Sequence, residues 1–356
     1  MINENAIKSY LLRAFPQARS IDIRRLGSGV QGSGFLVEVE TPEGIVPYVV
    51  KTLLSEGLGH DYPSDRAAVF LLDLDEFKNL PRHVKAIDVF SEMEDGSIRS
   101  IGGGREYYLL MERGEGISYF EDLKSFAQKD RLGVLDRERI VAMAAYLAGI
   151  HSVKKDSPTL YRRKLRDTVG HGECLMGVFD TYPDGVLDDG TMSLIITKSI
   201  EWIIRLKPKY NRLSQIHGDF HPGNIWFKDA TTDSGSTDAV DFILLDRSRG
   251  PWGEPADDVT ALAINYIFFS LLNHGDVRGA YGEGFRLFFD EYITRTGDRE
   301  ITSVVAPFFA FRGAVIANPI FYPEVSPSQR ESIFRFVLNV LDDEAFRYES
   351  VDAYLR

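Results

Sequence analysis

The order of apolar and polar residues predicts a β-rich first third of the chain. Apolar and polar residues alternate over 35–40, which is typical of a half-buried strand. Thr41-Pro-Glu-Gly44 is a turn sequence, so a second strand over 46–54 makes a hairpin with the first. Apolar residues at helical spacing predict a helix over 64–78, and further strands are expected over 84–90 and 106–111.

The rest of the chain has the periodicity of amphipathic helices. The clearest helix is predicted over 137–153, where Ile140, Met143 and Leu147 share one stripe. Other helices are expected over 193–206, 256–273, 277–295, 301–317 and 326–341, with short strands at 225–227 and 240–245. Glu112-Arg-Gly-Glu-Gly116 interrupts the pattern between the two parts. We therefore expect two lobes, residues 1–113 and 114–356, with a nucleotide cleft between them.

Charge and cysteine content exclude several classes of protein. The 356 residues carry a formal net charge of −12, which disfavours binding to nucleic acid or to anionic lipid. One cysteine cannot form an internal disulfide. The N-terminus lacks the pattern of a secretory signal, and no stretch approaches the ~20 apolar residues of a membrane span. We expect a cytoplasmic protein that binds neither membranes nor nucleic acid.

The segment His217-Gly-Asp-Phe-His-Pro-Gly-Asn224 carries the strongest chemical signal. An aspartate five positions before an asparagine, ahead of a short strand, is the layout of a phosphotransferase catalytic loop. Asp219 is expected to face the acceptor hydroxyl as the base, and Asn224 to turn back toward a Mg²⁺ ion on the phosphates. Pro222 and Gly223 permit the sharp turn between them.

A second signal is the apolar strand that ends in a carboxylate, Ile243-Leu-Leu-Asp246. Strand ends open onto clefts, so Asp246 is predicted to be the other protein ligand of Mg²⁺. Asp241-Phe242 superficially matches the magnesium-binding motif of protein kinases. It lacks the following glycine, and Asp241 falls inside the predicted strand, so Asp246 is preferred.

A glycine-rich segment before a strand, Gly27-Ser-Gly-Val-Gln-Gly-Ser-Gly34, predicts a phosphate-binding loop. Lys51 follows on the next strand, where kinases place the ammonium that pairs the α- and β-phosphates. That lysine normally pairs with a glutamate on the following helix. The matching position here is Asp65, with Asp61 and Glu76 as alternatives. The nucleotide-binding residues predicted in this region are Gly27, Ser28, Gly29, Gly32, Ser33, Lys51 and Asp65.

Together these motifs resemble the aminoglycoside phosphotransferase and choline kinase superfamily. The resemblance rests on His217–Asn224, on Leu244-Leu-Asp246 and on Trp252-Gly-Glu-Pro-Ala-Asp-Asp-Val259, and extends more weakly over most of residues 20–320. It implies an α+β, protein-kinase-like fold with a β-rich N-lobe and a mostly helical C-lobe. It also implies that Asp219 is the base and that Asn224 and Asp246 bind Mg²⁺.

The same resemblance implies roles for supporting residues. Asp258 would steady the catalytic loop, and His217 would brace it. His151, at the end of a Leu-Ala-Gly-Ile-His segment, would pack structurally and not act in catalysis. Residues 107–116 are similar to the family's hinge, in which Glu112 and Gly114 would offer backbone groups to adenine.

The function implied is transfer of a γ-phosphoryl group from ATP, or GTP, to a hydroxyl of a small molecule such as an aminoglycoside, amino alcohol or sugar. The acceptor site is expected in segments 155–192 and 308–325. Two alternatives stay open: a non-catalytic nucleotide-binding pseudokinase, and a protein kinase. The sequence lacks a recognisable activation segment ending in Ala-Pro-Glu, which disfavours the protein kinase.

Overall fold

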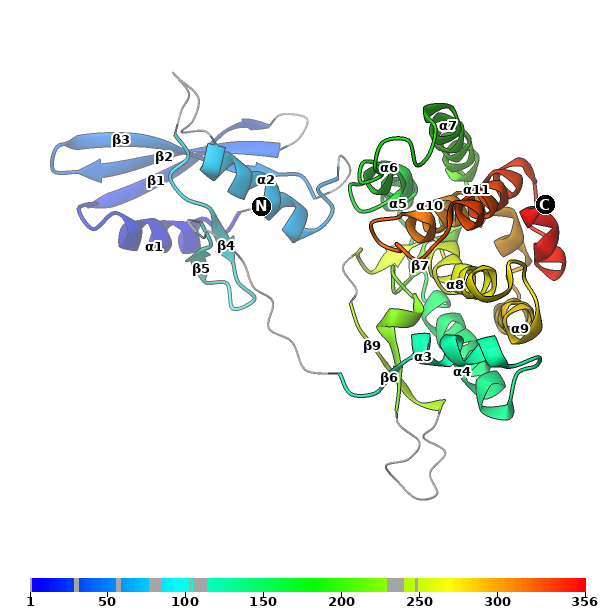
Figure 1. Ribbon diagram of the computed structural model, residues 1–356. Coiled ribbons are helices and arrows are strands. Elements are labelled where there is room, and N and C mark those ends of the chain that lie inside the picture. The colour runs from blue at the N-terminus through cyan, green and yellow to red at the C-terminus, as the bar shows by residue number, and fades with distance from the viewer. Residues whose placement is uncertain are drawn as a thin grey trace. The chain divides into compact units, whose positions relative to one another are not determined.

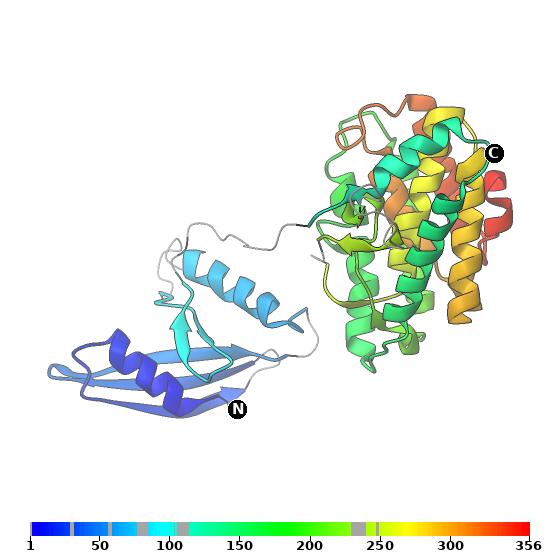
Figure 2. The same cartoon turned by 90° about the horizontal axis from the view of Figure 1, so that it is seen from below.

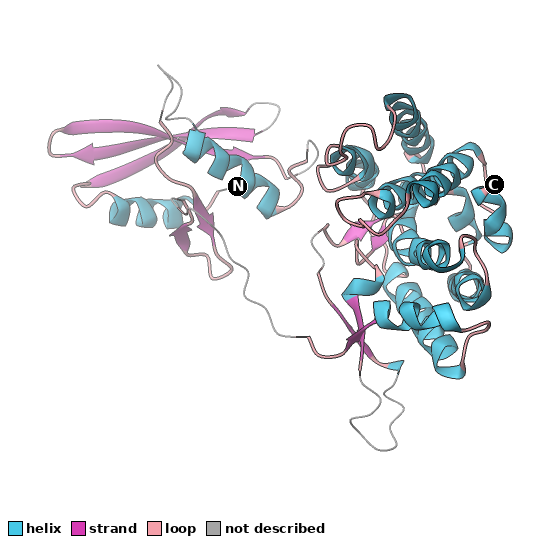
Figure 3. Cartoon of the chain, in the orientation of Figure 1, coloured by secondary structure: helices cyan, strands magenta, loops and turns pink. Residues whose placement is uncertain are grey.

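The chain divides into two compact units, residues 1–111 and 112–356. The structure is a computed structural model that describes residues 2–28, 32–55, 59–76, 85–102, 104, 114–228, 240–246 and 249–356. Long strands belong to the first unit and most helices to the second (Figure 3). The α+β prediction, with a β-rich first part and a mostly helical second part, is confirmed.

The first unit is built on an antiparallel sheet with strand order β1-β2-β3. Apolar residues alternate along β1 and β2, so Ile21, Ile23, Val37 and Val39 reach one face of the sheet. Helix α1 covers that face and completes a small core (Figure 1). The elements are α1 (Glu4–Ala14), β1 (Ser20–Ser28), β2 (Gly32–Thr41), β3 (Gly44–Leu53), α2 (Pro63–Glu76), β4 (Phe90–Glu92) and β5 (Ile98–Ser100).

The second unit is organised around one central helix, α8 (Ala256–His274), whose residues from Ala256 to Leu271 are all buried. Helices α4 (Val134–His151) and α8 both pack against α9 (Gly279–Thr296), and Figure 2 shows the three side by side. Helix α10 (Ala306–Ala317) packs against α8 and α11 (Pro327–Asp342). The remaining helices are α3 (Tyr119–Ser125), α5 (Pro158–Gly170), α6 (Leu175–Phe179) and α7 (Asp189–Leu206).

Short strands in the second unit support the catalytic segment. β8 (Ile225–Phe227) lies between β6 (Ile117–Ser118) and β9 (Phe242–Leu244), and β7 (Ser214–Gln215) pairs with β10 (Trp252–Gly253). The residues between β7 and β8 form the predicted catalytic loop. Because β7 and β8 belong to different sheets, the loop crosses from one small sheet to the other and both of its ends are fixed.

Most predicted helices lie within a few residues of their expected bounds, but two segments differ. The helix predicted over 301–317 begins only at Ala306, after a 3-10 turn at Arg299–Ser303, and has proline in its first turn. The strand predicted over 84–90 begins at Phe90, where a hairpin with β5 starts, and residues 85–89 are not in a strand. The strand predicted over 106–111 lies outside the described residues. No helix in the described ranges is long and apolar enough to cross a bilayer.

Candidate active site

The predicted catalytic loop is a tight turn closed by its own hydrogen bonds. Gly218 adopts a positive φ of 89°, which favours glycine, and Pro222–Asn224 form one 3-10 turn. The side-chain Nδ2 of Asn224 donates to the Asp219 carbonyl oxygen at 3.0 Å. The Asp219 N–H donates to Nδ1 of His217 at 3.2 Å. The loop therefore holds Asp219 and Asn224 in one fixed relation.

Asp258, in the first turn of α8, fastens this loop to the core. Its fully buried carboxylate accepts from the backbone N–H groups of His217 and Gly218, each at 2.7 Å, and from Nε2 of His151 at 3.1 Å. Burial raises the pKa of Asp258, but the hydrogen bonds from His151 and His217 outweigh it, so the pKa lies below its usual value. His151 also bonds the Tyr292 hydroxyl at 2.8 Å and is almost fully buried, as a structural histidine should be.

The Asp219 carboxylate lies between two arginines that the sequence reasoning did not single out. Nη1 of Arg312 lies 2.6 Å from Oδ1 of Asp219, and Nη1 of Arg249 lies 2.8 Å from the same oxygen. Burial raises the pKa of Asp219, but the charges of Arg312 and Arg249 outweigh it and lower the pKa to about 2. The carboxylate is therefore ionised at neutral pH.

The second oxygen of Asp219 has a different environment. Among the described residues Oδ2 accepts no hydrogen bond, and Nε2 of His221 lies 3.8 Å away. Nδ1 of His221 accepts from the Gly223 N–H at 3.1 Å, so the neutral ring carries its proton on Nε2. Burial lowers the pKa of His221, and the two arginines lower it further against the opposing effect of Asp219. His221 thus presents a donor toward Asp219, which disfavours it as a rival base.

Asp246 follows β9 and lies beside the loop because the Leu245 N–H donates to the Asn224 carbonyl at 2.9 Å. It has a positive φ of 49°, unlike every other described non-glycine residue, and such backbone strain is concentrated at functional sites. Asp241 instead precedes the strand, with an exposed side chain paired to Lys228. The expectation that Asp241 lies inside the strand is therefore wrong, because β9 begins one residue later.

Asn224 and Asp246 fit a magnesium ion in their chemistry. Nδ2 of Asn224 is committed to the loop, so its Oδ1 remains as an acceptor, and Asp246 offers an exposed carboxylate. Mg²⁺ prefers oxygen ligands and is commonly bound by one or two protein groups together with phosphates and waters. The chemistry of these two side chains is therefore compatible with the predicted metal site, which stays a prediction.

A cavity of about 380 Å³ opens beside Asp219. Asp219, Asp246 and Arg249 line it. The rest of its wall comes from Gly172, Glu173, Gly177, Val178, Thr181, Val315 and Phe321. These residues belong to the two segments, 155–192 and 308–325, that were expected to form the acceptor site.

Several predicted nucleotide residues lie close together on the sheet of the first unit: Gly27, Ser28, Gly32, Ser33 and Lys51. Gly27 and Ser28 end β1, and Gly32 and Ser33 begin β2, with Gly27 opposite Gly34 and Ser28 opposite Ser33. Lys51 lies opposite Gly34 on the neighbouring strand β3. The sheet register therefore places the lysine next to the glycine-rich hairpin. Gly29 lies outside the described residues.

The partner predicted for Lys51 lies at a helix end. Asp65 is in the first turn of α2, where its carboxylate accepts from the Tyr62 N–H at 2.8 Å, and its pairing with Lys51 stays a prediction. In the hinge segment, Glu112 lies outside the described residues. At Gly114 a β-carbon would come within 2.8 Å of the Leu245 side chain, so this position requires glycine or a shift of that leucine.

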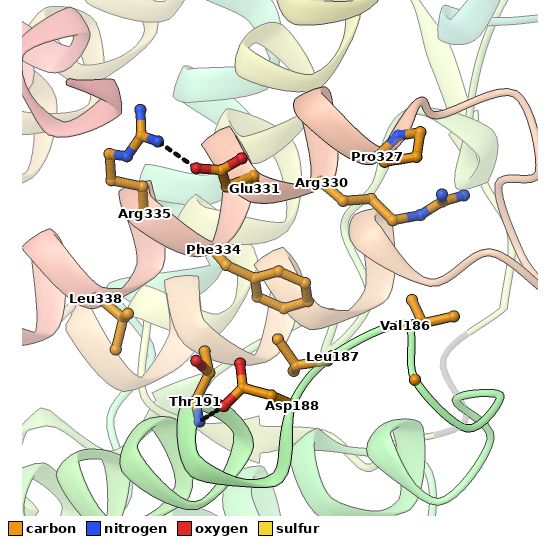
Figure 4. Close-up of a pocket in the computed structure, with 11 residues that line it drawn as sticks. Val186, Leu187, Asp188, Thr191, Pro327, Arg330, Glu331, Phe334, Arg335 and Leu338 are labelled. Carbon is orange, nitrogen blue, oxygen red and sulfur yellow. Dashed lines mark hydrogen bonds and ion pairs between the residues drawn. The ribbon is translucent and has the colours of Figure 1, made fainter.

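A larger cavity, of about 580 Å³, lies between the loop before α7 and helix α11 (Figure 4), and none of the predicted site residues lines it. Its charged side chains serve local structure. The Asp188 carboxylate caps α7 by accepting from the Thr191 N–H at 2.9 Å, and Arg335 pairs with Glu331 one turn away. We therefore assign the candidate active site to the cavity at Asp219.

The sequence model of the phosphotransferase enzyme family matches residues 22–242, which is more than half of the chain. The chain belongs to the phosphotransferase enzyme family. The matched region includes the glycine-rich hairpin, Lys51 and the whole catalytic loop, and it ends at the start of β9. Comparison with curated proteins gives no match.

Solved structures of several phosphotransferases are similar to this family member. One is a thermostable mutant of aminoglycoside phosphotransferase APH(4)-Ia, 13% identical over 92% of this chain and 98% of that one, with a TM-score of 0.35. Another is an ethanolamine kinase from Plasmodium vivax, 12% identical over 100% and 82%, with a TM-score of 0.32. A choline kinase from Cryptosporidium parvum is 10% identical over 98% and 92%, also with a TM-score of 0.32. Similarities this distant carry no information on the substrate.

The site residues that sequence reasoning missed lie mostly beyond the region that the family matches. Arg249 follows Asp246 by three positions, and Asp257 and Arg312 belong to α8 and α10. Lys164, on α5, donates to the Arg249 carbonyl. A usable signal existed for Arg312, because it is a lone charge in the otherwise apolar segment Ala306–Ala317.

Proposed function

We propose that this member of the phosphotransferase family is an ATP-dependent enzyme that phosphorylates a hydroxyl of a small molecule. The observation that carries the proposal is the ionised Asp219 carboxylate, whose Oδ2 accepts no hydrogen bond from the described residues and which lines a cavity together with Asp246. A carboxylate with one open oxygen is suited to accept the hydrogen bond of an alcohol. Its family membership supports phosphoryl transfer as the reaction.

In the proposed reaction the acceptor oxygen forms a bond to the γ-phosphorus while the bond to the β,γ-bridging oxygen breaks and ADP leaves. The hydroxyl proton passes to Oδ2 of Asp219. A carboxylate with a pKa of about 2 is a weak base, so the proton moves late, after the new bond has begun to form. Orientation of the hydroxyl is then the main contribution of Asp219, as expected for a loose transition state.

Binding of the nucleotide is assigned to the residues predicted for it. Lys51 would pair with the α- and β-phosphates, and the glycine-rich hairpin beside it would offer backbone N–H groups. Asn224 and Asp246 would hold Mg²⁺, which when bound offsets negative charge on the phosphate oxygens. The chain's own contribution is to keep Asn224 and Asp219 in one rigid turn.

The test is a screen for ADP release with Mg·ATP and Mg·GTP over a panel of sugars, amino alcohols and aminoglycosides. At least one acceptor should raise ADP release above the rate with water alone, and Asp219→Asn should abolish that increase. Nucleotide with Mg²⁺ should also raise the melting temperature, and Lys51→Ala should weaken the rise. Binding of ATP without turnover over the whole panel would reject the proposed enzyme in favour of a nucleotide-binding module.

A further inference from the structure

Arg312 joins the candidate base to the helical core at a point remote in sequence. It lies on α10, is 5% exposed, and spreads the two ends of its guanidinium over two carboxylates. Nη1 contacts Oδ1 of Asp219, and Nη2 contacts Oδ1 of Asp257, each at 2.6 Å. Nη2 also donates to the Gly218 carbonyl at 3.2 Å. One side chain thus contacts both the carboxylate of the base and the backbone directly before it.

The arrangement distinguishes the two oxygens of Asp219. Arg312 and Arg249 both donate to Oδ1, which is therefore doubly occupied. Both guanidinium groups also lie over the ring of Phe311, at 4.6 Å for Arg312 and 5.2 Å for Arg249. The two cations are thereby held against one apolar surface as well as against the carboxylate. Rotation of the carboxylate would break two charged hydrogen bonds at once, so Oδ2 is kept on the side away from the arginines.

We propose that Arg312 is a positioning residue that fixes the Asp219 carboxylate so that Oδ2 alone receives the acceptor hydroxyl. This inference rests on the proposed phosphotransferase function. It assigns Oδ2 as the proton-accepting atom. It also adds to the site a residue that lies 70 positions beyond the end of the family match at residue 242. Arg249 shares the contact with Oδ1, but its side chain also lines the cavity, and Arg312 does not.

The chain offers a matched control for a buried, bridging arginine. Arg212 is also 5% exposed and also bridges acids, Glu254 at 2.8 Å and Asp298 at 2.7 Å, with a longer contact to Glu300 at 3.4 Å. None of these acids contacts the Asp219 side chain. A merely structural role for Arg312 therefore predicts the same functional consequence for both arginines, whereas a positioning role does not.

The experiment compares Arg312→Gln/Asp257→Asn, Arg312→Lys and Arg212→Lys. The double variant removes the cation together with the acid that would be left unpaired, so it keeps the buried charge balanced. Turnover is measured as Mg·ATP hydrolysis with water as the acceptor, and with any acceptor from the screen, and ATP affinity by calorimetry. We expect kcat of the double variant to fall by ~10²-fold, the scale of a misplaced catalytic group, with ATP affinity unchanged. Arg312→Lys should lose less of kcat than the double variant, because lysine keeps the positive charge but lacks the planar guanidinium group.

A readout independent of turnover separates this inference from the proposed function. If Arg312 acts through Asp219, the fall in unfolding temperature caused by Arg312→Lys is smaller in an Asp219→Asn background than in the wild type. Equal falls in both backgrounds would overturn the inference, as would wild-type kcat in the double variant or an equal loss of kcat in Arg212→Lys. Absence of turnover in every protein, with the unfolding temperatures still coupled, would reject only the phosphotransferase proposal.

Discussion

Replacing Asp219 by asparagine should destabilise the second unit, because it removes the ionised carboxylate that pairs with two arginines. The size of the loss follows from the pKa shift of Asp219. The pKa of the carboxyl is lowered to about 2 from a usual value of 3.8. Each tenfold change in an acidity constant corresponds to ~1.36 kcal/mol. The ionised carboxylate therefore contributes about 2 kcal/mol to the free energy of unfolding at neutral pH. For a unit of this size such a loss lowers the melting temperature by ~4–8 °C.

The pKa shift also determines how this destabilisation depends on pH. Because the pKa is lower in the folded state, the contribution is complete above the unfolded pKa of ~3.9 and is lost as the pH falls toward ~2. The difference in unfolding free energy between wild type and Asp219→Asn should stay near its full value down to about pH 4 and be roughly halved by about pH 3. Urea unfolding followed by circular dichroism over this range measures it.

Asp241→Asn is the control, because that carboxylate is exposed and its ion pair within the described residues is with Lys228 on the surface. Its effect should stay below ~0.5 kcal/mol at every pH. The reasoning fails if Asp219→Asn is as stable as the wild type at pH 7. It also fails if the deficit at pH 3 equals the deficit at pH 7, because the stabilisation would then not come from the ionised carboxylate.

Three further substitutions test the rest of the site. In Asp258→Asn the side-chain NH2 faces one backbone N–H of the loop, which then lacks an acceptor. The free energy of unfolding in urea should fall by ~3–5 kcal/mol, and a loss below ~1 kcal/mol would contradict the role of Asp258 in holding the loop. Asp246→Ala should remove the Mg²⁺ dependence of ATP binding in calorimetry, whereas the exposed Asp241→Ala should retain it; the opposite pattern would make Asp241 the metal ligand. The single-turnover transfer rate of His221→Ala should stay within ~10-fold of wild type, whereas that of Asp219→Asn should fall by ~10²–10⁴-fold. The reverse order would exclude Asp219 as the base.

The catalytic loop could be predicted from sequence because its polar residues are neighbours along the chain. Within the eight residues from His217 to Asn224 the loop contains its own aspartate, asparagine and turn residues, so the spacing alone suggests the chemistry. Asp246 could be predicted for a similar reason, since a carboxylate at the end of an apolar strand is conspicuous in the sequence. Helix α8 was also clear, because an apolar segment too short for a membrane has to be buried.

The arginine contacts could not be predicted because they depend on how distant helices pack. Arg312 is 93 residues from Asp219, and the packing of α10 against α8 brings the two side chains together. Asp257 was part of a recognised motif, but its role appears only once Arg312 is beside it. The strand expected over 84–90 differed for a more local reason, since the pairing of a hairpin, and not apolar content, decides where a strand begins.

Helix α10 carries both a residue that contacts Asp219 and a residue that lines the cavity, which matters for engineering. Arg312 contacts Asp219, and Val315, three residues later on the same helix, lines the cavity proposed for the acceptor. A larger or smaller side chain at 315 that displaces the helix would also displace the guanidinium at Asp219. Selection for a new acceptor at this wall should therefore carry a loss of rate. Thr181 is tied to the same helix, because its hydroxyl accepts from Nδ2 of Asn318, the C-cap of α10, at 2.7 Å. A library at Glu173, an exposed lining residue that precedes α6, should instead separate specificity from rate.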